Sequence, residues 1–181
     1  SIQQSEQHYF RLANYDSLTG LPNRAMFQDR LEQSLLQTQR DRCTMALVFI
    51  DVDHFKEVND MLGHQAGDAV LQEVAARLKT CVRKADTLAR LGGDEFTAIL
   101  CNLKHASDAA KVARNILSRM ALPLTLDGET CHISVSVGIA LYPDDGSTAE
   151  DLLKCADQAM YAAKHGGRNQ FQFFHAAQAG N

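Results

Sequence analysis

The sequence predicts an α+β fold, a ferredoxin-like palm in which helices flank a central mixed sheet of mostly antiparallel strands. Three observations support this prediction. An uninterrupted apolar run at 45–50 is typical of a strand buried on both faces, turns at 92–93 and 127–128 indicate two hairpins, and helical periodicity fills the segments between them. The expected order is helix, strand, two helices, hairpin, helix, hairpin, helix and strand.

Composition limits the functions that the chain can have. With 181 residues, 45% of them hydrophobic, it can form one domain with a real core. Its formal net charge of -4 argues against a broad basic surface for a nucleic acid polymer or an anionic membrane. Any phosphate site must therefore be local.

Cysteine usage and hydropathy indicate a cytoplasmic domain. The five cysteines are widely spaced and form no C-x-x-C pair, which is typical of reduced core cysteine. The longest apolar run, 45–50, is far too short to span a bilayer, and no signal-like leader precedes it. If the native protein is a membrane-anchored multidomain protein, we expect its anchor to lie outside this chain.

The first segments are expected to be helical. Residues 1–14 are polar with spaced apolar positions, as in the end of a connector helix that continues upstream. A turn-rich segment follows at 16–24, in which Asn23 can cap a helix over 24–40. We expect the folded domain to span 15–175.

The buried strand ends in a pair of carboxylates, Asp51 and Asp53. A carboxylate at the end of such a strand is costly unless it is paired or bound to a metal. Helical periodicity then predicts helices at 55–62 and 69–82, separated by Gly63.

The first hairpin has two glycines and two carboxylates in its turn. The glycines permit positive φ and let a ligand approach bare backbone, especially at Gly93. Asp94 and Glu95 place two negative charges where they have little room to separate, and such a pair requires a cation. The alternative is an ordinary solvent-exposed turn, because Gly, Asp and Glu are common there.

A helix is expected to start at Ser107 or Asp108 and to run to about residue 120. The return strand of the second hairpin, 131–141, alternates between apolar residues and small or polar ones. We therefore expect one of its faces to lie in the core and the other to be lightly covered.

The C-terminal part begins with a capping box at 147–150, which starts a helix that should end at 166–167. Aromatic residues at 171–174 suggest a last strand. The small and polar residues 176–181 are expected to form a flexible tail or linker.

The carboxylates of Asp51, Asp94 and Glu95 are oxygen ligands of the kind that Mg²⁺ or Mn²⁺ prefers when it carries a nucleotide triphosphate. Two ions per site suit this chemistry, one activating the attacking hydroxyl and the α-phosphate, the other neutralising the pyrophosphate. The alternative for Asp51 alone is a helix N-cap.

Four segments resemble the signatures of one family. The sequence R-L-G-G-D-E-F at 90–96 resembles the motif of the GGDEF family, the diguanylate cyclases that make cyclic di-GMP from GTP. The lead-in D-x-L-T-G-L-x-N-R at 16–24, the pattern D-x-D-x-F-K-x-x-N-D-x-x-G-H-x-x-G-D at 51–68 and the close A-D-x-A-M-Y-x-A-K-x-x-G-R-N at 156–169 resemble it as well. The resemblance implies a palm similar to those of nucleotide cyclases and polymerases.

By this resemblance, Asp51, the Val52 carbonyl, Asp94 and Glu95 bind metal, and the last two are the catalytic residues. The substrate-binding residues that it implies are Asn59 and Asp68 for guanine, Phe55, Lys56 and Gly93 around the phosphates, and Lys164 and Arg168 for the triphosphate. Plainer readings stay open: Asn59 can lie on a polar helix face, Asp68 can cap a helix, and Lys164 and Arg168 can compensate a helix dipole.

Arg83 and Asp86 match the R-x-x-D product-inhibition motif of many diguanylate cyclases in content and in distance from the glycine turn. Arg114, on the outward face of the following helix, can supply a further arginine to that site. The alternative for Arg114 is a solvated helix surface.

The resemblance implies a diguanylate cyclase that condenses two GTP molecules into cyclic di-GMP with release of two pyrophosphates. A 3'-hydroxyl attacks an α-phosphate, with Glu95 or a hydroxide on the metal as base. Because one site holds one GTP, the reaction needs a homodimer, and an upstream sensor domain is expected. The alternatives are a catalytically silent module that binds GTP or cyclic di-GMP and regulates an attached domain, and a nucleotidyltransferase of other specificity.

Overall fold

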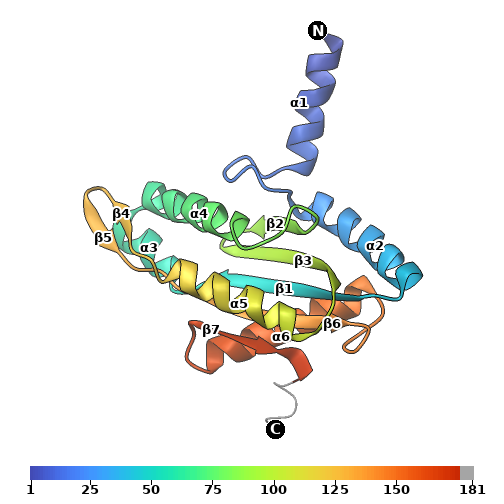
Figure 1. Cartoon of the computed structure of the whole chain (residues 1–181). Coiled ribbons are helices and arrows are strands. Elements are labelled where there is room, and N and C mark those ends of the chain that lie inside the picture. The colour runs from blue at the N-terminus through green and yellow to red at the C-terminus, as the bar shows by residue number, and fades with distance from the viewer. Residues whose placement is uncertain (176–181) are drawn as a thin grey trace.

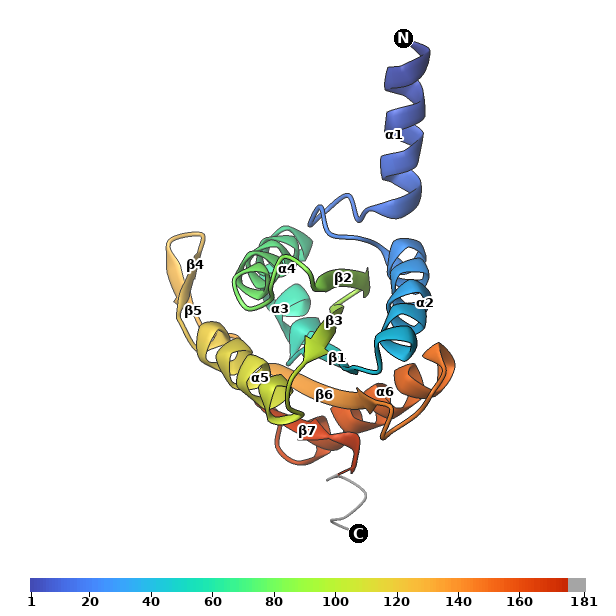
Figure 2. The same ribbon diagram turned by 45° about the vertical axis from the view of Figure 1, so that its right-hand side comes forward.

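The computed structural model describes residues 1–175 and contains a central sheet between two layers of helices (Figures 1 and 2). The helices are α1 (Ile2–Asn14), α2 (Arg24–Asp41), α3 (Phe55–Leu62), α4 (His64–Lys79), α5 (Ser107–Met120) and α6 (Ala149–His165). The strands are β1 (Thr44–Val52), β2 (Thr87–Gly92), β3 (Glu95–Leu103), β4 (Leu124–Leu126), β5 (Glu129–Cys131), β6 (Val135–Tyr142) and β7 (Gln170–Phe173).

The central sheet has the strand order β2-β3-β1-β6-β7. Its pairs are antiparallel except for β6 and β7, which run parallel, so the sheet is mixed and mostly antiparallel. The strands β4 and β5 form a separate two-stranded hairpin. The predicted α+β palm is thus confirmed.

Strand β1 lies at the centre and is buried on both faces, as its continuous apolar run predicts. Its residues alternate between two cores. Val48 and Ile50 face the core made with α4 and α5, whereas Leu47 and Phe49 face the core made with α2 and α6. This alternation fixes the face to which each later residue of the strand belongs.

Helix α1 projects away from the rest of the molecule (Figure 1), and none of its residues is buried. Its N-terminus is capped by Ser1, which forms a capping box with Gln4. None of the helices in residues 1–175 is long and apolar enough to cross a membrane.

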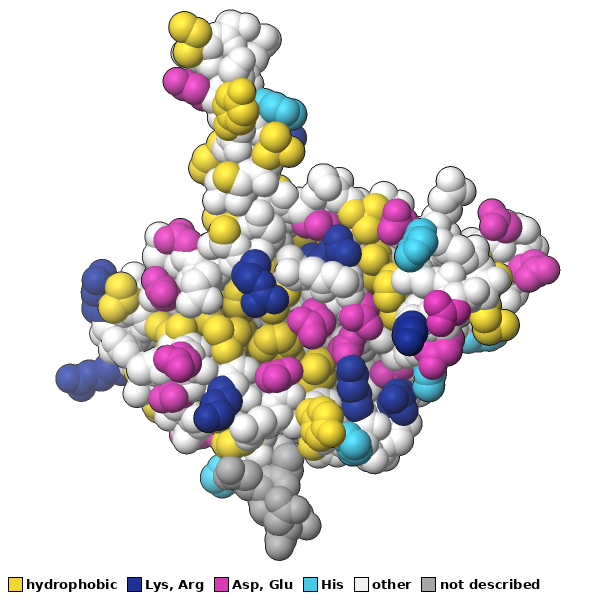
Figure 3. All heavy atoms as spheres, turned by 180° about the vertical axis from the view of Figure 1, so that it is seen from behind, with side chains coloured by type: hydrophobic (Ala, Val, Ile, Leu, Met, Phe, Trp, Pro, Cys, Tyr) yellow, Lys and Arg dark blue, Asp and Glu magenta, His cyan; other side chains and the backbone are white. Residues whose placement is uncertain are grey.

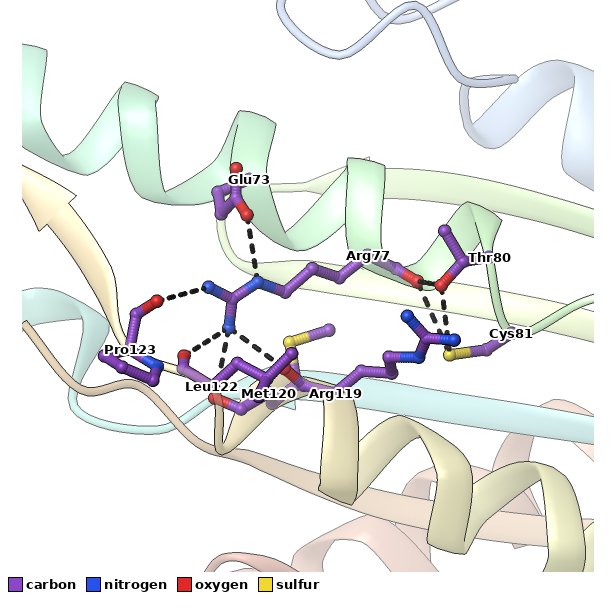
Figure 4. A network of polar contacts seen from close by, with 8 residues as sticks. All are labelled: Glu73, Arg77, Thr80, Cys81, Arg119, Met120, Leu122 and Pro123. Atoms are coloured by element: carbon purple, nitrogen blue, oxygen red, sulfur yellow. Dashed lines mark hydrogen bonds and ion pairs between the residues drawn. The ribbon is translucent and has the colours of Figure 1, made fainter.

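Helix α4 is tied to the end of α5 by the buried Arg77 (Figure 4). The guanidinium pairs with Glu73 on its own helix at 3.0 Å. It also donates hydrogen bonds to carbonyl oxygens at the end of α5, those of Arg119, Met120, Leu122 and Pro123. The carbonyls of Arg119 and Met120 lie in the last turn of α5, where donors within the helix run out, and those of Leu122 and Pro123 belong to the segment that follows. Arg77 satisfies all four and so fixes the end of α5 against α4.

Several element boundaries differ from those predicted. The expected return strand 131–141 is split into β5 and β6, and all of β6 except Tyr142 is buried, because β1 and β7 flank it and helices cover both faces. The second helix after β1 starts earlier than predicted, at His64, directly after Gly63, and ends at Lys79.

The C-terminal helix is capped differently from the prediction. Thr148, rather than Ser147, is the N-cap of α6, and its hydroxyl accepts a hydrogen bond from the backbone N–H of Asp151. Because Thr148 has the extended backbone that an N-cap needs, the N-cap lies one residue later than predicted, and only this one-way hydrogen bond is found there rather than the predicted capping box. The last strand ends at Phe173, one residue before the predicted end. The expected tail at 176–181 lies outside the described residues.

Candidate active site

The pairing of β1 with β3 brings the acidic residues of two distant segments to one edge of the sheet. Asp51 stands directly opposite Glu95 in this antiparallel pair. The next backbone N–H, that of Val52, donates to the Asp94 carbonyl at 3.2 Å. Residues opposite each other point to the same face, so Asp51 and Glu95 both lie on the face covered by α2 and α6.

The turn between β2 and β3 is held by Arg90. Gly92 and Gly93 have φ of 146° and 51°, which explains why glycine occupies both positions. The Arg90 guanidinium donates to the Gly93 carbonyl at 2.8 and 3.0 Å and to the carboxylate of Asp16 at 2.8 Å. The lead-in segment therefore braces the turn, a connection that the sequence prediction missed.

Burial raises the pKa of both carboxyl groups in this turn. For Asp94 its own backbone N–H and the Arg90 charge oppose the rise in pKa. For Glu95 the negative charges of Asp94 and Asp157 add to the effect of burial, while Arg24 opposes it. Two carboxyls that resist ionisation next to each other need a cation to hold both charges.

Lys164, at the end of α6, forms an ion pair with Asp51. Asp51 is only 3% exposed, and its other carboxylate oxygen, Oδ1, is buried and accepts no hydrogen bond from the residues that the structure describes. Burial and the nearby Arg168 charge lower the pKa of Lys164. A buried carboxylate with one oxygen on a cation and one free matches the chemistry of a metal ligand.

Asp53 is also buried, and three donors surround its carboxylate. Oδ1 accepts from the Ser136 hydroxyl at 2.6 Å, and Oδ2 accepts from the Ser134 hydroxyl at 2.6 Å and from the Asn169 backbone N–H at 3.0 Å. The sequence prediction assigned Asp53 no role in the site. The serines at alternate positions of the predicted return strand were the available signal, since a buried carboxylate needs donors.

The residues expected to bind guanine lie where α3 meets α4. Asn59 is half-buried and so close to Gly67 that a Cβ there would lie 1.9 Å from its Oδ1. Asp68, the next residue of α4, is exposed and lies in the second turn, so it does not cap that helix. Phe55 is half-buried against Gly67 and Lys56 is exposed.

The N-cap alternative for Asp51 is also wrong. Asp51 lies inside β1, and the residue at the N-cap of α3 is His54, whose side chain makes no capping hydrogen bond. The apolar run ends at residue 50, whereas β1 continues to Val52. The sequence pattern therefore did not show whether Asp51 belongs to the strand or caps the following helix.

The predicted product-inhibition residues form a compact turn. Asp86, 2% exposed, accepts from the N–H of Arg83 at 2.9 Å and from the N–H of Cys101 at 3.1 Å. The Arg83 side chain pairs with Asp86 and bonds to the Cys101 carbonyl, yet is 58% exposed. A cavity of about 280 Å³ lies between this turn and the start of α5. Arg114 is exposed on α5, and no described contact joins it to the other two residues.

Within residues 1–175 no three His, Cys, Asp or Glu side chains are already gathered as a metal site. Acidic side chains nevertheless gather in the middle of the face opposite that of Figure 1, and Lys and Arg side chains lie beside them (Figure 3). The fold and this site define an α+β palm with an acidic edge next to basic side chains.

The chain belongs to the GGDEF family. The family model described as "Diguanylate cyclase, GGDEF domain" matches residues 13–170. The chain is 45% identical over its full length to the bifunctional diguanylate cyclase/cyclic di-GMP phosphodiesterase MucR of Pseudomonas aeruginosa, of which it covers 26%. It is 48% identical to the diguanylate cyclase TpbB of the same species over 86% of this chain and 36% of that protein.

Solved structures agree with this assignment. The GGDEF domain of TpbB from Pseudomonas aeruginosa superposes with a TM-score of 0.86 at 47% identity, over 88% of this chain and 93% of that one. The coiled coil and GGDEF domain of DgcB from Caulobacter crescentus, in complex with c-di-GMP, has a TM-score of 0.86 at 31% identity, over 95% and 91% of the two chains. Since the chain spans about a quarter to a third of the curated relatives named above, it corresponds to one part of them.

Proposed function

We propose that this domain is a diguanylate cyclase that condenses two GTP molecules into cyclic di-GMP and releases two pyrophosphates. The observation that carries the proposal is the register of β1 and β3, which sets Asp51 opposite Glu95 and bonds Val52 to Asp94. Three acidic residues from two separate segments thus lie at one edge of the sheet. Membership of the GGDEF family supports the same reaction.

The residues that would hold Mg²⁺ or Mn²⁺ are Asp51, the Val52 carbonyl, Asp94 and Glu95. The unpartnered buried oxygen of Asp51 and the two carboxyls of raised pKa fit a divalent cation. Two bound ions would supply charge neutralisation at the α-phosphate and at the leaving pyrophosphate. The Lys164 ammonium pairs with Asp51 in the structure and would have to give up this contact, at least in part, to a bound metal ion.

Substrate recognition falls to the residues around that edge. Asn59 and Asp68 would read guanine, since a carboxylate accepts from guanine N1–H and N2–H₂, and adenine offers no such donor pair. Lys164 and Arg168, at the end of α6, would hold the triphosphate. Phe55, Lys56 and Gly93 would line the site around the phosphates.

The product joins two nucleotides, so two domains must face each other with one GTP in each. Glu95 is the proposed base that takes the proton of the attacking 3'-hydroxyl. We further propose that residues 15–175 form the cyclase domain and that 1–14 connect it to an upstream sensor. The projection of α1 away from the sheet suits such a connector.

The test is incubation of the chain with GTP and Mg²⁺, with the product identified by mass. Cyclic di-GMP and pyrophosphate are expected with GTP, and neither a cyclic dinucleotide nor pyrophosphate with ATP. A Glu129→Gln variant, altered at an exposed carboxylate of β5, is the matched control and should stay active. Tight GTP binding without pyrophosphate release would instead favour a silent regulatory module, and a product from ATP would indicate another nucleotidyltransferase.

A further inference from the structure

Two carboxylates at the end of β1 hold the end of α6 and the segment after it. Asp51 pairs with Lys164, in the last turn of α6, and Asp53 accepts from the backbone N–H of Asn169. Arg168 lies between these two attachment points. Lys164 and Arg168, the residues proposed to hold the triphosphate, are therefore both held in place by contacts with the end of β1, which also carries the proposed metal ligand Asp51.

The segment that carries Arg168 has an unusual backbone. Gly167, Arg168 and Asn169 have φ of 117°, 63° and 48°, so three consecutive residues adopt positive φ. Residues other than glycine and asparagine occupy this region at a cost, so contacts must hold Arg168 there. The bond from Asn169 to Asp53 is such a contact, and directly after it Gln170 begins the parallel pairing of β7 with β6.

We infer that Asp53 is a positioning residue for the triphosphate, rather than a metal ligand. This inference rests on the proposed function. The carboxylate accepts a hydrogen bond from the backbone N–H of Asn169. It thereby fixes the backbone at 168–169, which sets the direction of the Arg168 side chain. Its two oxygens already accept three hydrogen bonds from Ser134, Ser136 and Asn169, and Asp53 is only 6% exposed. Three of the roughly four acceptor positions of this buried carboxylate are thus taken by donors of the protein itself.

The hydrogen-bond pattern predicts how substitutions differ. Oδ2 accepts two of the bonds, including the one from Asn169, whereas Oδ1 accepts only the Ser136 hydroxyl. An Asp53→Asn variant can keep its oxygen toward Asn169 and turn its NH₂ to Ser136, because a hydroxyl also accepts. Asn is therefore expected to preserve the position of Arg168, and Ala to lose it.

The experiment measures the affinity of the chain for a non-hydrolysable GTP analogue in Mg²⁺ by calorimetry, together with Tm. Asp53→Ala is expected to weaken binding by about tenfold, the loss of roughly one charge-assisted contact to phosphate, and Asp53→Asn by less than about threefold. Asp53→Ala combined with Arg168→Ala should bind about as weakly as Arg168→Ala alone, because both remove the same contact.

Ser136→Ala is the matched control for stability. It removes one hydrogen bond from Asp53 and leaves that of Asn169, so Tm should fall while analogue affinity stays within about twofold of the parent. Amide hydrogen exchange at Asn169 should accelerate in Asp53→Ala and not in Ser136→Ala. If Asp53→Ala does not fold, Asp53→Ser, too short to reach Asn169, takes its place.

Three outcomes would overturn the inference: unchanged affinity in Asp53→Ala, an equal loss in Ser136→Ala, or additive losses in the double variant. A parent chain that binds no GTP analogue would overturn it as well. A parent that binds the analogue but forms no cyclic di-GMP would refute the proposed reaction and leave the role of Asp53 to be judged by the affinities.

Discussion

At the scale of single residues, the acidic turn holds two carboxyl groups whose charged forms are disfavoured by burial. Asp94 and Glu95 are half-buried side by side, and both have a raised pKa. A carboxyl whose folded-state pKa is raised stabilises the fold while protonated. That contribution is present below the unfolded pKa and is lost as pH rises through the folded pKa. At neutral pH without metal, the charged turn therefore costs stability.

Replacing Glu95 with Gln should abolish synthesis and stabilise the metal-free protein. We expect the rate of cyclic di-GMP formation to fall by roughly 10²- to 10⁴-fold, the usual contribution of a positioned base. Tm at neutral pH should rise by roughly 1–3 °C, a modest value because the group is partly exposed, and the difference should vanish at acidic pH. Mass detection of product and thermal unfolding across pH measure the two effects.

The control for this variant is Glu129→Gln, which should change neither quantity. Full residual activity in Glu95→Gln would remove Glu95 from the mechanism. A fall in Tm at neutral pH would contradict the argument from the pKa of Glu95.

The exposed guanidinium of Arg83 leads to a second prediction. If Arg83 and Asp86 bind the product, cyclic di-GMP inhibits the parent, and Arg83→Ala should raise the half-inhibiting concentration at least about tenfold, because an Arg–phosphate contact is lost. Steady-state rates at increasing cyclic di-GMP measure this. Lys84→Ala, the exposed neighbour, should leave inhibition unchanged. Equal inhibition in the parent and in Arg83→Ala would end the assignment.

At the scale of elements, the close packing of α6 against β6 depends on Gly138, a strand residue without a side chain. A Cβ at Gly138 would lie 2.1 Å from the backbone nitrogen of Met160 and 2.3 Å from the carbonyl oxygen of Ala156. Backbone atoms cannot give way as a flexible side chain can. Lys164 lies in the last turn of the same helix, so this packing also determines where Lys164 stands relative to Asp51.

Gly138→Ala is therefore expected to destabilise the domain by about 3 kcal/mol, the upper range for overpacking a core. Urea unfolding followed by circular dichroism gives the free energy. The control is Ala140→Gly, the reverse change two residues along on the same face, which should cost only about 1 kcal/mol. Comparable losses in the two variants would show that α6 can shift without penalty.

At the scale of the whole molecule, one domain presents one acidic edge, whereas the proposed product contains two nucleotides. Specific activity should therefore rise with protein concentration wherever most of the chain is monomeric, since the active species is a dimer. Initial rates over a dilution series, with albumin holding total protein constant, measure this dependence. Specific activity that stays constant down to the lowest concentration would contradict a site shared between two copies.

Elements with strong local patterns could be predicted from the sequence alone. The apolar run of β1, the glycine turn before β3 and the Asn23 cap of α2 all appear in the structure as expected. Their signals are local, because they depend on neighbouring residues and on backbone conformation. The resemblance to the GGDEF family, also read from contiguous motifs, is confirmed by the family match.

Boundaries that depend on neighbours in space could not be predicted in the same way. The alternation at 131–141 suggested one lightly covered face, yet Ser136 and Gly138 are buried because α6 lies on them. The contacts of Asp53 and Arg90 with distant partners were missed for a related reason. Their partners, Asn169 and Asp16, are far away in sequence and carry no mark of the contact.

The sequence by itself determined the identity of the acidic and basic residues, the turn that carries two of them, and the class of fold. Only the tertiary structure decided which of them meet. The register of β1 against β3 selects Glu95 as the neighbour of Asp51, and the packing of α6 brings Lys164 to the same carboxylate. Local propensity fixes φ, ψ and the facing of a side chain, whereas register and helix position result from burying two cores at once.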